Sequence, residues 1–201
     1  EIMPSLVGSE MCIRDRSMIK RHKQIFDDLH TLPEHVVIQI NETHPALAIP
    51  ELMRILMDEE GFGWDEAYQI VKKMFHYTNH TIMTEAMECW DENMFRFLLP
   101  RIYQIVCAFN EKYCNKIMAY YSHDEEKVRS MAIIGNNEIR MANLCVAVCR
   151  RVNGVSNLHG DILKEKIFNS SYRIFPQKYL AITNGITHRR WLALALSLIH
   201  I

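Results

Sequence analysis

Three short polar runs interrupt the apolar patterning of this chain, and their residue types suit a ligand covered in hydroxyl groups. The runs are Asn41-Glu42-Thr43-His44-Pro45, Tyr77-Thr78-Asn79-His80-Thr81 and Thr183-Asn184-Gly185-Ile186-Thr187. Hydroxyl, amide and imidazole groups are unfavourable to bury unless a partner hydrogen-bonds to them. Asn, Thr and His offer donors and acceptors without fixed charge. A sugar is the ligand that these runs predict.

The second run also contains a histidine pair that resembles a metal site. His76 and His80 are four residues apart, as in a helical metal-binding pair. A metallohydrolase helix carries Glu directly after the first His, whereas Tyr77 stands there. Thr78 and Asn79 also favour a turn over a helix. We therefore expect no metal here, and a loop histidine satisfied by backbone carbonyls remains the plain alternative for His80.

The elements that must position these runs are mostly helical. The apolar periodicity and the caps predict helices over 18–29, 50–61, 65–73, 85–121 with a break before Pro100, a short helix from Asp124, 138–151, and a last one from Thr187 carrying Trp191 and Leu192. Strands are expected at 36–40, whose β-branched run is typical of a buried parallel strand, and at 179–182. Asp65 is the expected N-cap of its helix, and Asn153-Gly154 the expected stop of another.

Bulk properties bound the class of protein. A chain of 201 residues can bury one good core, and 49% hydrophobic with 23% charged residues is typical of a soluble globular protein. The net charge of −1 argues against nucleic acid or an anionic membrane as partner, because Arg150-Arg151 and Arg189-Arg190 are small clusters. No apolar run approaches membrane-spanning length and no secretory signal is visible. A cytoplasmic location is expected.

Cysteine usage agrees with a reducing compartment. Cys89, Cys107, Cys114, Cys145 and Cys149 fall in segments expected to be helical. Free thiols on the apolar face of a helix behave as small apolar groups. No C-x-x-C pair is present, so zinc and redox sites are not expected.

The two ends of the chain carry an unusual relationship to each other. Leu196 to Ile201 can be encoded by CTGTCTCTTATACACATC, and the reverse complement of that element encodes Met11 to Arg16. The element resembles a transposon-end sequencing adapter. We therefore interpret residues 1–16 and 196–201 as translated adapter sequence and exclude them from fold reasoning. A natural tail at each end is the alternative, and resequencing of the source DNA separates the two.

Four motifs in order carry a family resemblance. They are residues 36–54 (VVIQINETHPALAIPELMR), Tyr77 to Thr81, Asn153 to Asp161 (NGVSNLHGD) and Thr183 to Trp191 (TNGITHRRW). Together they resemble the α-glucan phosphorylases, the glycogen, starch and maltodextrin enzymes, over roughly residues 17 to 195. The resemblance implies an α/β fold that is a fragment of a two-domain, Rossmann-like glycosyltransferase-B architecture, mostly helical in this segment. It assigns 17–183 to the C-terminal part of the N-terminal domain and 184–195 to the start of the C-terminal domain.

The resemblance also implies roles for single residues. The catalytic residue would be His80, whose side chain would bind the 6-hydroxyl of the reacting glucosyl unit and whose main-chain carbonyl would face its developing positive charge. Substrate-binding roles are implied for Asn184, Val155, Glu42, Thr43, His44 and Thr81. His159 is expected to hold a turn rather than to act in catalysis. Most relatives carry Asp at the position of Glu42, often Ser or Thr at Gly160, and Pro at His188.

The implied reaction is phosphorolysis of an α-1,4-glucan with inorganic phosphate, giving α-D-glucose 1-phosphate. Its transition state is oxocarbenium-like, so the site must stabilise positive charge at C1. The family uses pyridoxal 5′-phosphate, held by a lysine in the C-terminal half, beyond this chain. We therefore expect this fragment to be inactive and to bind no cofactor, and its parent to be a homodimer.

Two other classes of protein remain open from the sequence. A noncatalytic glucan-binding protein with a degenerate phosphorylase fold would share these motifs. A helical interaction module is the second alternative, and the polar runs argue against it, because protein partners rarely need such clusters.

Overall fold

A four-stranded parallel sheet organises the chain. The computed structural model describes residues 4–122, 124–185 and 187–190, with side-chain burial from residue 15 onward. The strands of this sheet are β1 (Ile38–Asn41), β2 (Phe75–Asn79), β6 (Val152–Gly154) and β7 (Tyr179–Ala181), in the order β1-β2-β6-β7. All three neighbouring pairs are parallel. A second, antiparallel sheet has the order β3-β5-β4 and consists of β3 (Cys89–Asp91), β5 (Glu138–Arg140) and β4 (Ile134–Gly135).

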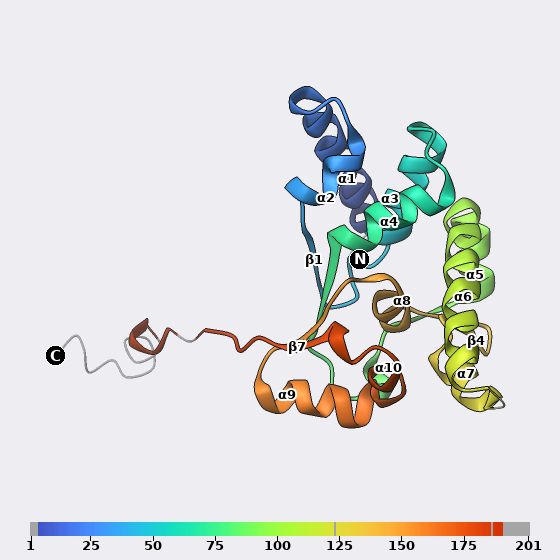
Figure 1. Cartoon of the computed structure of the whole chain (residues 1–201), viewed down its shortest axis with the longest axis vertical. Coiled ribbons are helices and arrows are strands. Elements are labelled where there is room, and N and C mark those ends of the chain that lie inside the picture. The colour runs from blue at the N-terminus through green and yellow to red at the C-terminus, as the bar shows by residue number, and fades with distance from the viewer. Residues whose placement is uncertain (1–3, 123, 186, 191–201) are drawn as a thin grey trace.

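Helices connect the strands and make up most of the described chain (Figure 1). They are α1 (Pro4–Ile25), α2 (Leu32–His35), α3 (Ala48–Arg54), α4 (Trp64–Met74), α5 (Glu92–Leu98), α6 (Pro100–Tyr120), α7 (Glu125–Met131), α8 (Met141–Val148), α9 (Asn157–Ile162) and α10 (Asn169–Ile174). Single π-helical turns extend α3 over Ile55–Glu59 and α9 over Leu163–Ile167. Short 3₁₀ turns lie at Leu29–Thr31, Thr84–Ala86 and Pro176–Lys178. The expected mixed α/β, mostly helical fold is confirmed.

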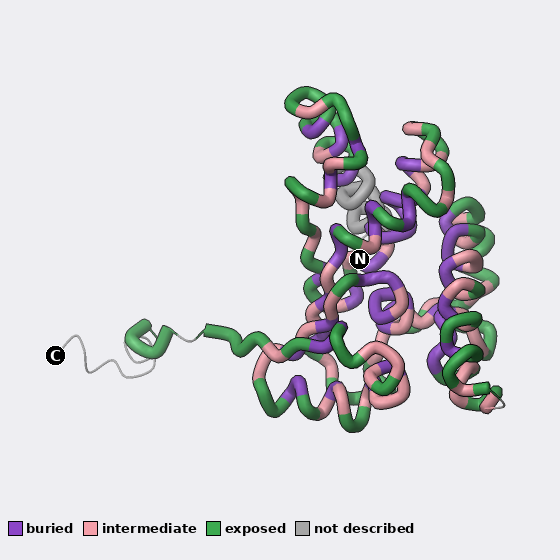
Figure 2. Tube along the Cα trace, in the orientation of Figure 1, coloured by how far each residue is buried: buried purple, intermediate pink, exposed green. Residues whose placement is uncertain are grey.

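The core lies between the parallel sheet and the helices that pack on it (Figure 2). Ile40, Phe75, Tyr77 and Val152 in three adjacent strands are all buried. Burying side chains of this size is worth roughly 1.5–3 kcal/mol each, which is the main stabilisation available to such short strands. Helix α8 packs against β2, and α6 packs against both α3 and α8. The strands are thus held by burial as well as by their ladder.

Two long helical segments predicted from periodicity are wrong at their starts. The segment 85–121 contains β3 before α5, and the segment 138–151 begins with β5. Cys89 accordingly lies exposed in a strand rather than on a helix face. Both strands are only three residues long. Such short strands could not be recognised next to the helical spacing of apolar residues in the adjoining segments.

Several predicted boundaries and caps can be compared with the structure. Asp124 caps α7, as expected, by accepting a hydrogen bond from the Lys127 N–H at 3.0 Å. The cap of α4 is Gly63 rather than Asp65. Asn153-Gly154 lies within β6 rather than stopping a helix, because α8 already ends at Val148.

The ends of the chain differ in how much is described. Helix α1 begins at Pro4, well before the predicted start at residue 18, and ends at Ile25 rather than 29. It therefore runs through residues 11–16, whose adapter origin stays a prediction. Residues 188–190 are helical, and Trp191, Leu192 and 196–201 lie outside the described residues. Among the described helices, none is long and apolar enough to cross a membrane.

Two glycines allow a close approach where β6 leads into α9. A Cβ on Gly154 would lie 2.8 Å from the backbone of Gly160. A Cβ on Gly160 would lie 2.5 Å from the Cβ of Ala181 in β7. These contacts press the start of α9 directly onto the last residues of β6 and β7, so the turn at Val155 is set by backbone packing.

The first prediction concerns Gly154. Gly154→Ala should lower the free energy of unfolding of this chain by about 1–3 kcal/mol, because the neighbouring backbone cannot yield as a side chain would. Urea unfolding followed by circular dichroism measures this. Gly185→Ala is the matched control, since no described atom lies within 4 Å of the added methyl group. Equal effects of the two substitutions would contradict the close-packing argument.

A buried carboxyl group in α1 is poorly accommodated. Asp15 is only 4% exposed, and its Oδ2 has no hydrogen-bond partner among the described residues. Burial, reinforced by the nearby Glu51 carboxylate, raises the pKa of Asp15 to about 7. The folded state therefore holds the Asp15 proton more tightly than the unfolded state does. Stability from this group is present at low pH and is lost as pH rises from about 4 through about 7.

The second prediction follows from that linkage. Asp15→Asn removes the ionisation, so it should stabilise the chain by about 2–3 kcal/mol more at pH 8 than at pH 5. Urea titrations at the two pH values measure the difference. Asp27→Asn, on an exposed position, is the matched control for the same change of side chain. A gain at Asp15 that is the same at both pH values would show that its charge is not the cause.

Candidate functional site

Each of the three polar runs lies at the end of a strand of the parallel sheet. β1 ends at Asn41, β2 ends at Asn79, and β7 ends at Ala181, two residues before Thr183. β6 ends at Gly154, directly before Val155. Because all four strands are parallel, their carboxyl ends form one edge of the sheet. This edge, here called the polar edge, is where α/β proteins commonly bind ligands.

The carboxylate of Glu42 ties the first run to the second. Its Oε2 accepts hydrogen bonds from the His80 backbone N–H at 2.8 Å and from the Thr81 hydroxyl at 3.1 Å. The Tyr77 hydroxyl lies 3.5 Å from Oε1. Glu42 adopts a φ of 63°, a left-handed conformation that is rare for a residue with a side chain. The bonds made by the carboxylate offset this backbone strain.

The ring of His80 is oriented by the last residue of β1. Its Nε2 lies 2.5 Å from Oδ1 of Asn41. An amide oxygen only accepts, so Nε2 carries a proton, and in the neutral form of the ring Nδ1 is left as an acceptor. No partner of Nδ1 lies in the described part of the chain, and the His80 side chain is exposed. A ligand hydroxyl could donate to that nitrogen.

A chain of hydrogen bonds connects β6 with the third run. The Asn184 N–H donates to the Val155 carbonyl oxygen at 3.0 Å, and the Val155 N–H donates to Nδ1 of His159 at 3.1 Å. His159 therefore holds the turn through Nδ1, and its protonated Nε2 is buried without a partner in the described chain. Burial lowers the pKa of His159, and the nearby His80 lowers it further. Both effects disfavour the charged form of the His159 ring.

The remaining predicted residues differ in their access to the polar edge. The Thr43 side chain is buried and donates its hydroxyl to Glu88 Oε2 at 2.5 Å. Glu88 is also held by the Trp90 indole N–H at 2.8 Å. Thr43 therefore anchors its loop, whereas His44, Asn184 and the half-buried Val155 remain accessible. Glu42 and Thr81 are half-buried beneath His80.

Sequence reasoning missed two polar groups at this edge. Asn41, which orients His80, is the final residue of β1 and could have been found from its place at the strand end. Asn79 is fully buried, donates to the Tyr77 hydroxyl at 2.9 Å, and leaves its Oδ1 without a partner among the described atoms. The burial of Asn79 could not be predicted from the polar run around it, because it depends on how the neighbouring strands pack.

The geometry bears on metal and cofactor sites. His76 lies within β2 and His80 directly follows that strand, so the two histidines do not share a helical face. In the described part of the chain, no group of three or more potential ligands could hold a metal ion. Lys178 is buried, but its Nζ is bonded to the Val146 and Ala147 carbonyl oxygens before β7, at the opposite edge of the sheet. It does not fit a cofactor-bearing lysine for the polar edge.

Comparison with known proteins gives a consistent result. The family profile of the carbohydrate phosphorylases matches residues 11–199. Glycogen phosphorylase of Bacillus subtilis is 42% identical over 182 residues, which is 90% of this chain and 23% of that protein. The brain form of glycogen phosphorylase from Rattus norvegicus is 46% identical over 167 residues, 82% of this chain and 20% of that protein. The Haemophilus influenzae glycogen phosphorylase is 40% identical over 183 residues, 90% of this chain and 22% of that protein. The chain thus spans about a fifth of the length of these relatives.

The third prediction concerns the Glu42 carboxylate. Glu42→Ala and Glu42→Gly both remove its hydrogen bonds and should lower the free energy of unfolding by about 1–3 kcal/mol. The Gly variant should be the more stable of the two by about 0.5–1 kcal/mol, because glycine adopts the positive φ without strain. Thermal or urea unfolding measures the order. An Ala variant as stable as the Gly variant would show that the backbone at this position carries no strain.

Proposed function

Because the chain belongs to the carbohydrate phosphorylase family, we propose that it is part of an α-1,4-glucan phosphorylase. That enzyme would transfer the terminal glucosyl unit of a glucan to inorganic phosphate and release α-D-glucose 1-phosphate. The observation that carries this proposal is the polar edge, where uncharged donors and acceptors from neighbouring parallel strands meet. The relatives named glycogen phosphorylase support the same activity.

His80 and Asn184 would hold the 6-hydroxyl of the reacting glucosyl unit. Nδ1 of His80 is an available acceptor, since Nε2 is bonded to Asn41. The exposed Asn184 amide supplies donor and acceptor groups, and its backbone is tied to Val155. Val155 would pack against the sugar ring between the two. Fixing the hydroxyl in this way orients the ring for reaction, an effect that can be worth several kcal/mol.

The peptide of His80 would serve the transition state. Glu42 accepts the His80 N–H, and this bond fixes the peptide plane. A fixed peptide presents its carbonyl dipole without reorganisation when positive charge develops at C1 of the sugar. Glu42 would thus act by positioning the peptide, and Thr81 by positioning Glu42.

The wider architecture is part of the same proposal. Residues 17–183 would complete the N-terminal domain of a glycosyltransferase-B fold, and 184–195 would start the C-terminal domain. The exposed residues 187–190 lie away from the parallel sheet, which supports this division (Figure 1). Pyridoxal phosphate would supply a phosphate group for proton transfer in the parent, held by residues beyond this chain. A cytoplasmic homodimer is the proposed parent.

The fourth prediction tests the roles of His80 and Asn184. In the full-length parent, His80→Ala and Asn184→Ala should each lower kcat about a hundredfold, because the glucosyl ring is no longer held in register. Glucose 1-phosphate release from a glucan and phosphate measures kcat. His30→Ala, an exposed histidine bonded to Asp28, is the control and should retain normal turnover.

Other outcomes separate the parts of this proposal. This 201-residue chain alone should release no sugar phosphate and show no cofactor absorbance. Normal turnover by the His80 and Asn184 variants would contradict their roles. A full-length parent that binds glucan but never turns it over would favour a noncatalytic glucan-binding protein instead.

A further inference from the structure

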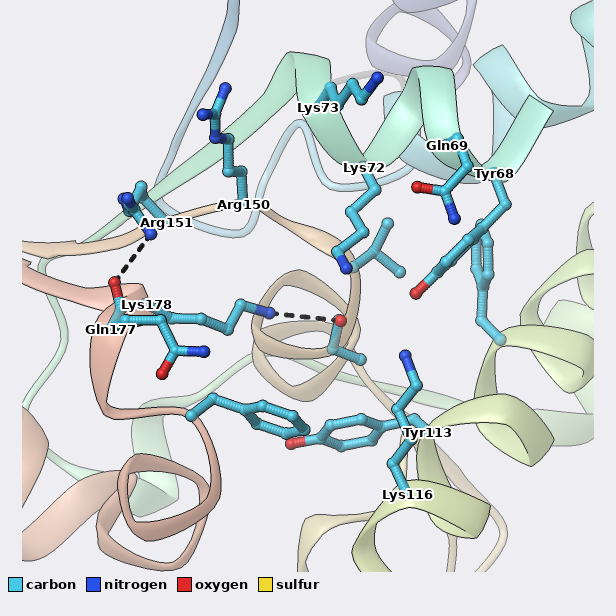
Figure 3. Close-up of a pocket in the computed structure, with 14 residues that line it drawn as sticks. Tyr68, Gln69, Lys72, Lys73, Tyr113, Lys116, Arg150, Arg151, Gln177 and Lys178 are labelled. Atoms are coloured by element: carbon cyan, nitrogen blue, oxygen red, sulfur yellow. Dashed lines mark hydrogen bonds between the residues drawn. The ribbon is translucent and has the colours of Figure 1, made fainter. Parts of the chain in front are cut away.

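A second, strongly basic pocket lies at the opposite edge of the parallel sheet. Lys72 and Lys73 are in the last turn of α4 before β2, Arg150 and Arg151 precede β6, and Lys178 precedes β7. Lys116 of α6 faces Lys72 across a cavity of about 370 Å³, whereas the side chain of Lys73 is directed away from it at the rim (Figure 3). The pocket therefore collects charges from four separated stretches of the chain at the amino ends of three strands.

The six cations of this pocket lack anionic partners. The residues that line it include no Asp or Glu. None of the ion pairs found within the described residues involves Lys72, Lys73, Lys116, Arg150, Arg151 or Lys178. The whole chain has a net charge of −1, so this concentration of positive charge is a local feature. Like charges held together around one cavity are unfavourable until an anion enters it.

The buried lysine of the pocket is affected by its neighbours. Burial lowers the pKa of Lys178 to about 8, and Lys72 and Lys116 contribute in the same direction. Burial also lowers the pKa of Lys116, with further contributions from Lys72 and Lys112. Lys178 donates to the carbonyl oxygens of Val146 and Ala147, which leaves one of its three N–H groups for another acceptor.

One wall of the pocket is aromatic. Tyr68, Phe109, Tyr113 and Phe175 line it beside the cations. The rings of Tyr113 and Phe175 are stacked with their centroids 6.3 Å apart. An inorganic ion gains no contact energy from an aromatic wall. The flat or apolar part of an organic molecule can pack against it.

We propose that this pocket binds a small organic phosphate, with the phosphate group among the cations and its apolar part on the aromatic wall. Arg150 offers a planar donor group that matches phosphate oxygens, and Lys72 and Lys116 add point charges. Arg151 donates from Nη1 to the Gln177 carbonyl oxygen at 2.8 Å and has its other donors left for the ligand. The size of the cavity suits a small molecule rather than a polymer. This proposal does not rest on the proposed glucan activity, because the two sites lie at opposite ends of the same strands. They are separated by about 10 Å of strand.

The fifth prediction uses phenyl phosphate as the probe for this 201-residue chain. Isothermal titration at pH 8 should show saturable one-to-one binding with a Kd below about 1 mM. Benzenesulfonate, which has the same ring and a single charge, should bind at least about tenfold more weakly. Absence of saturable phenyl phosphate binding to a folded chain would overturn the proposal.

Matched double variants test where the phosphate binds. Lys72→Gln with Arg150→Gln removes two charges from the pocket and should weaken binding at least about tenfold. Arg129→Gln with Lys166→Gln removes the same two kinds of charge from exposed positions outside the pocket. This control should change affinity by less than about twofold, because exposed distant charges are screened. Circular dichroism confirms that both variants fold, and equal weakening by both would show general attraction rather than a site.

Proton uptake and the parent protein supply independent readouts. A bound phosphate should raise the pKa of Lys178 from about 8, so binding at pH 8 should take up protons, as measured by titration in two buffers of different ionisation enthalpy. Proton release would contradict the assigned contact with Lys178. The full-length parent should bind phenyl phosphate with the same sensitivity to the pocket variants. Binding by this chain but not by the parent would show that a segment of the parent fills the pocket, which would overturn a small-molecule site.

Discussion

The parallel ladder of β1, β2, β6 and β7 is the constraint on which both sites depend. Its register pairs Asn41 with Thr78, Asn79 with Gly154, and Gly154 with Ala181. A slip of one residue would turn every side chain of a strand to the other face. The Glu42 bridge to His80 and the tie from Asn184 to Val155 both need strand ends at matching heights. The main-chain hydrogen bonds therefore define the distances at the polar edge before any side chain acts.

Much of the polar edge could be predicted from the sequence, but its framework could be predicted only in part. Strand 179–182 and the strand near 36–40 could be predicted because their residues are mostly apolar and include few turn formers. β2 and β6 were not, since β2 carries His76, Thr78 and Asn79, and β6 ends in Asn153-Gly154, which is typical of a turn. Both lie between other strands, so their extended conformation comes from neighbours on each side. Local patterns do not contain that information.

Side-chain partners show the same division between local and tertiary information. The run of His80 predicted a turn, whereas its place after β2 and the orientation of its ring by Asn41 depend on two strands that are distant in sequence. Thr43 belongs to the same polar run as Asn41, but its hydroxyl is bonded to Glu88, just before β3 of the second sheet. The basic pocket could not be predicted from the sequence at all. Arg150-Arg151 is a minor pair in the sequence, and only the fold brings it together with lysines from α4, α6 and the start of β7.

The contact between Gly160 and Ala181 has a consequence for how this family can vary. A methyl group at position 160 would occupy the space already filled by the Cβ of residue 181, which is only 2.5 Å away. The two positions therefore share one volume. A serine or threonine at the first requires a glycine at the second, or a helix that stands further from the sheet. In homologous chains, a larger residue at position 160 should accompany a smaller one at position 181, and the reverse. These compensating changes would lie 21 residues apart in the sequence and reflect one contact in the fold.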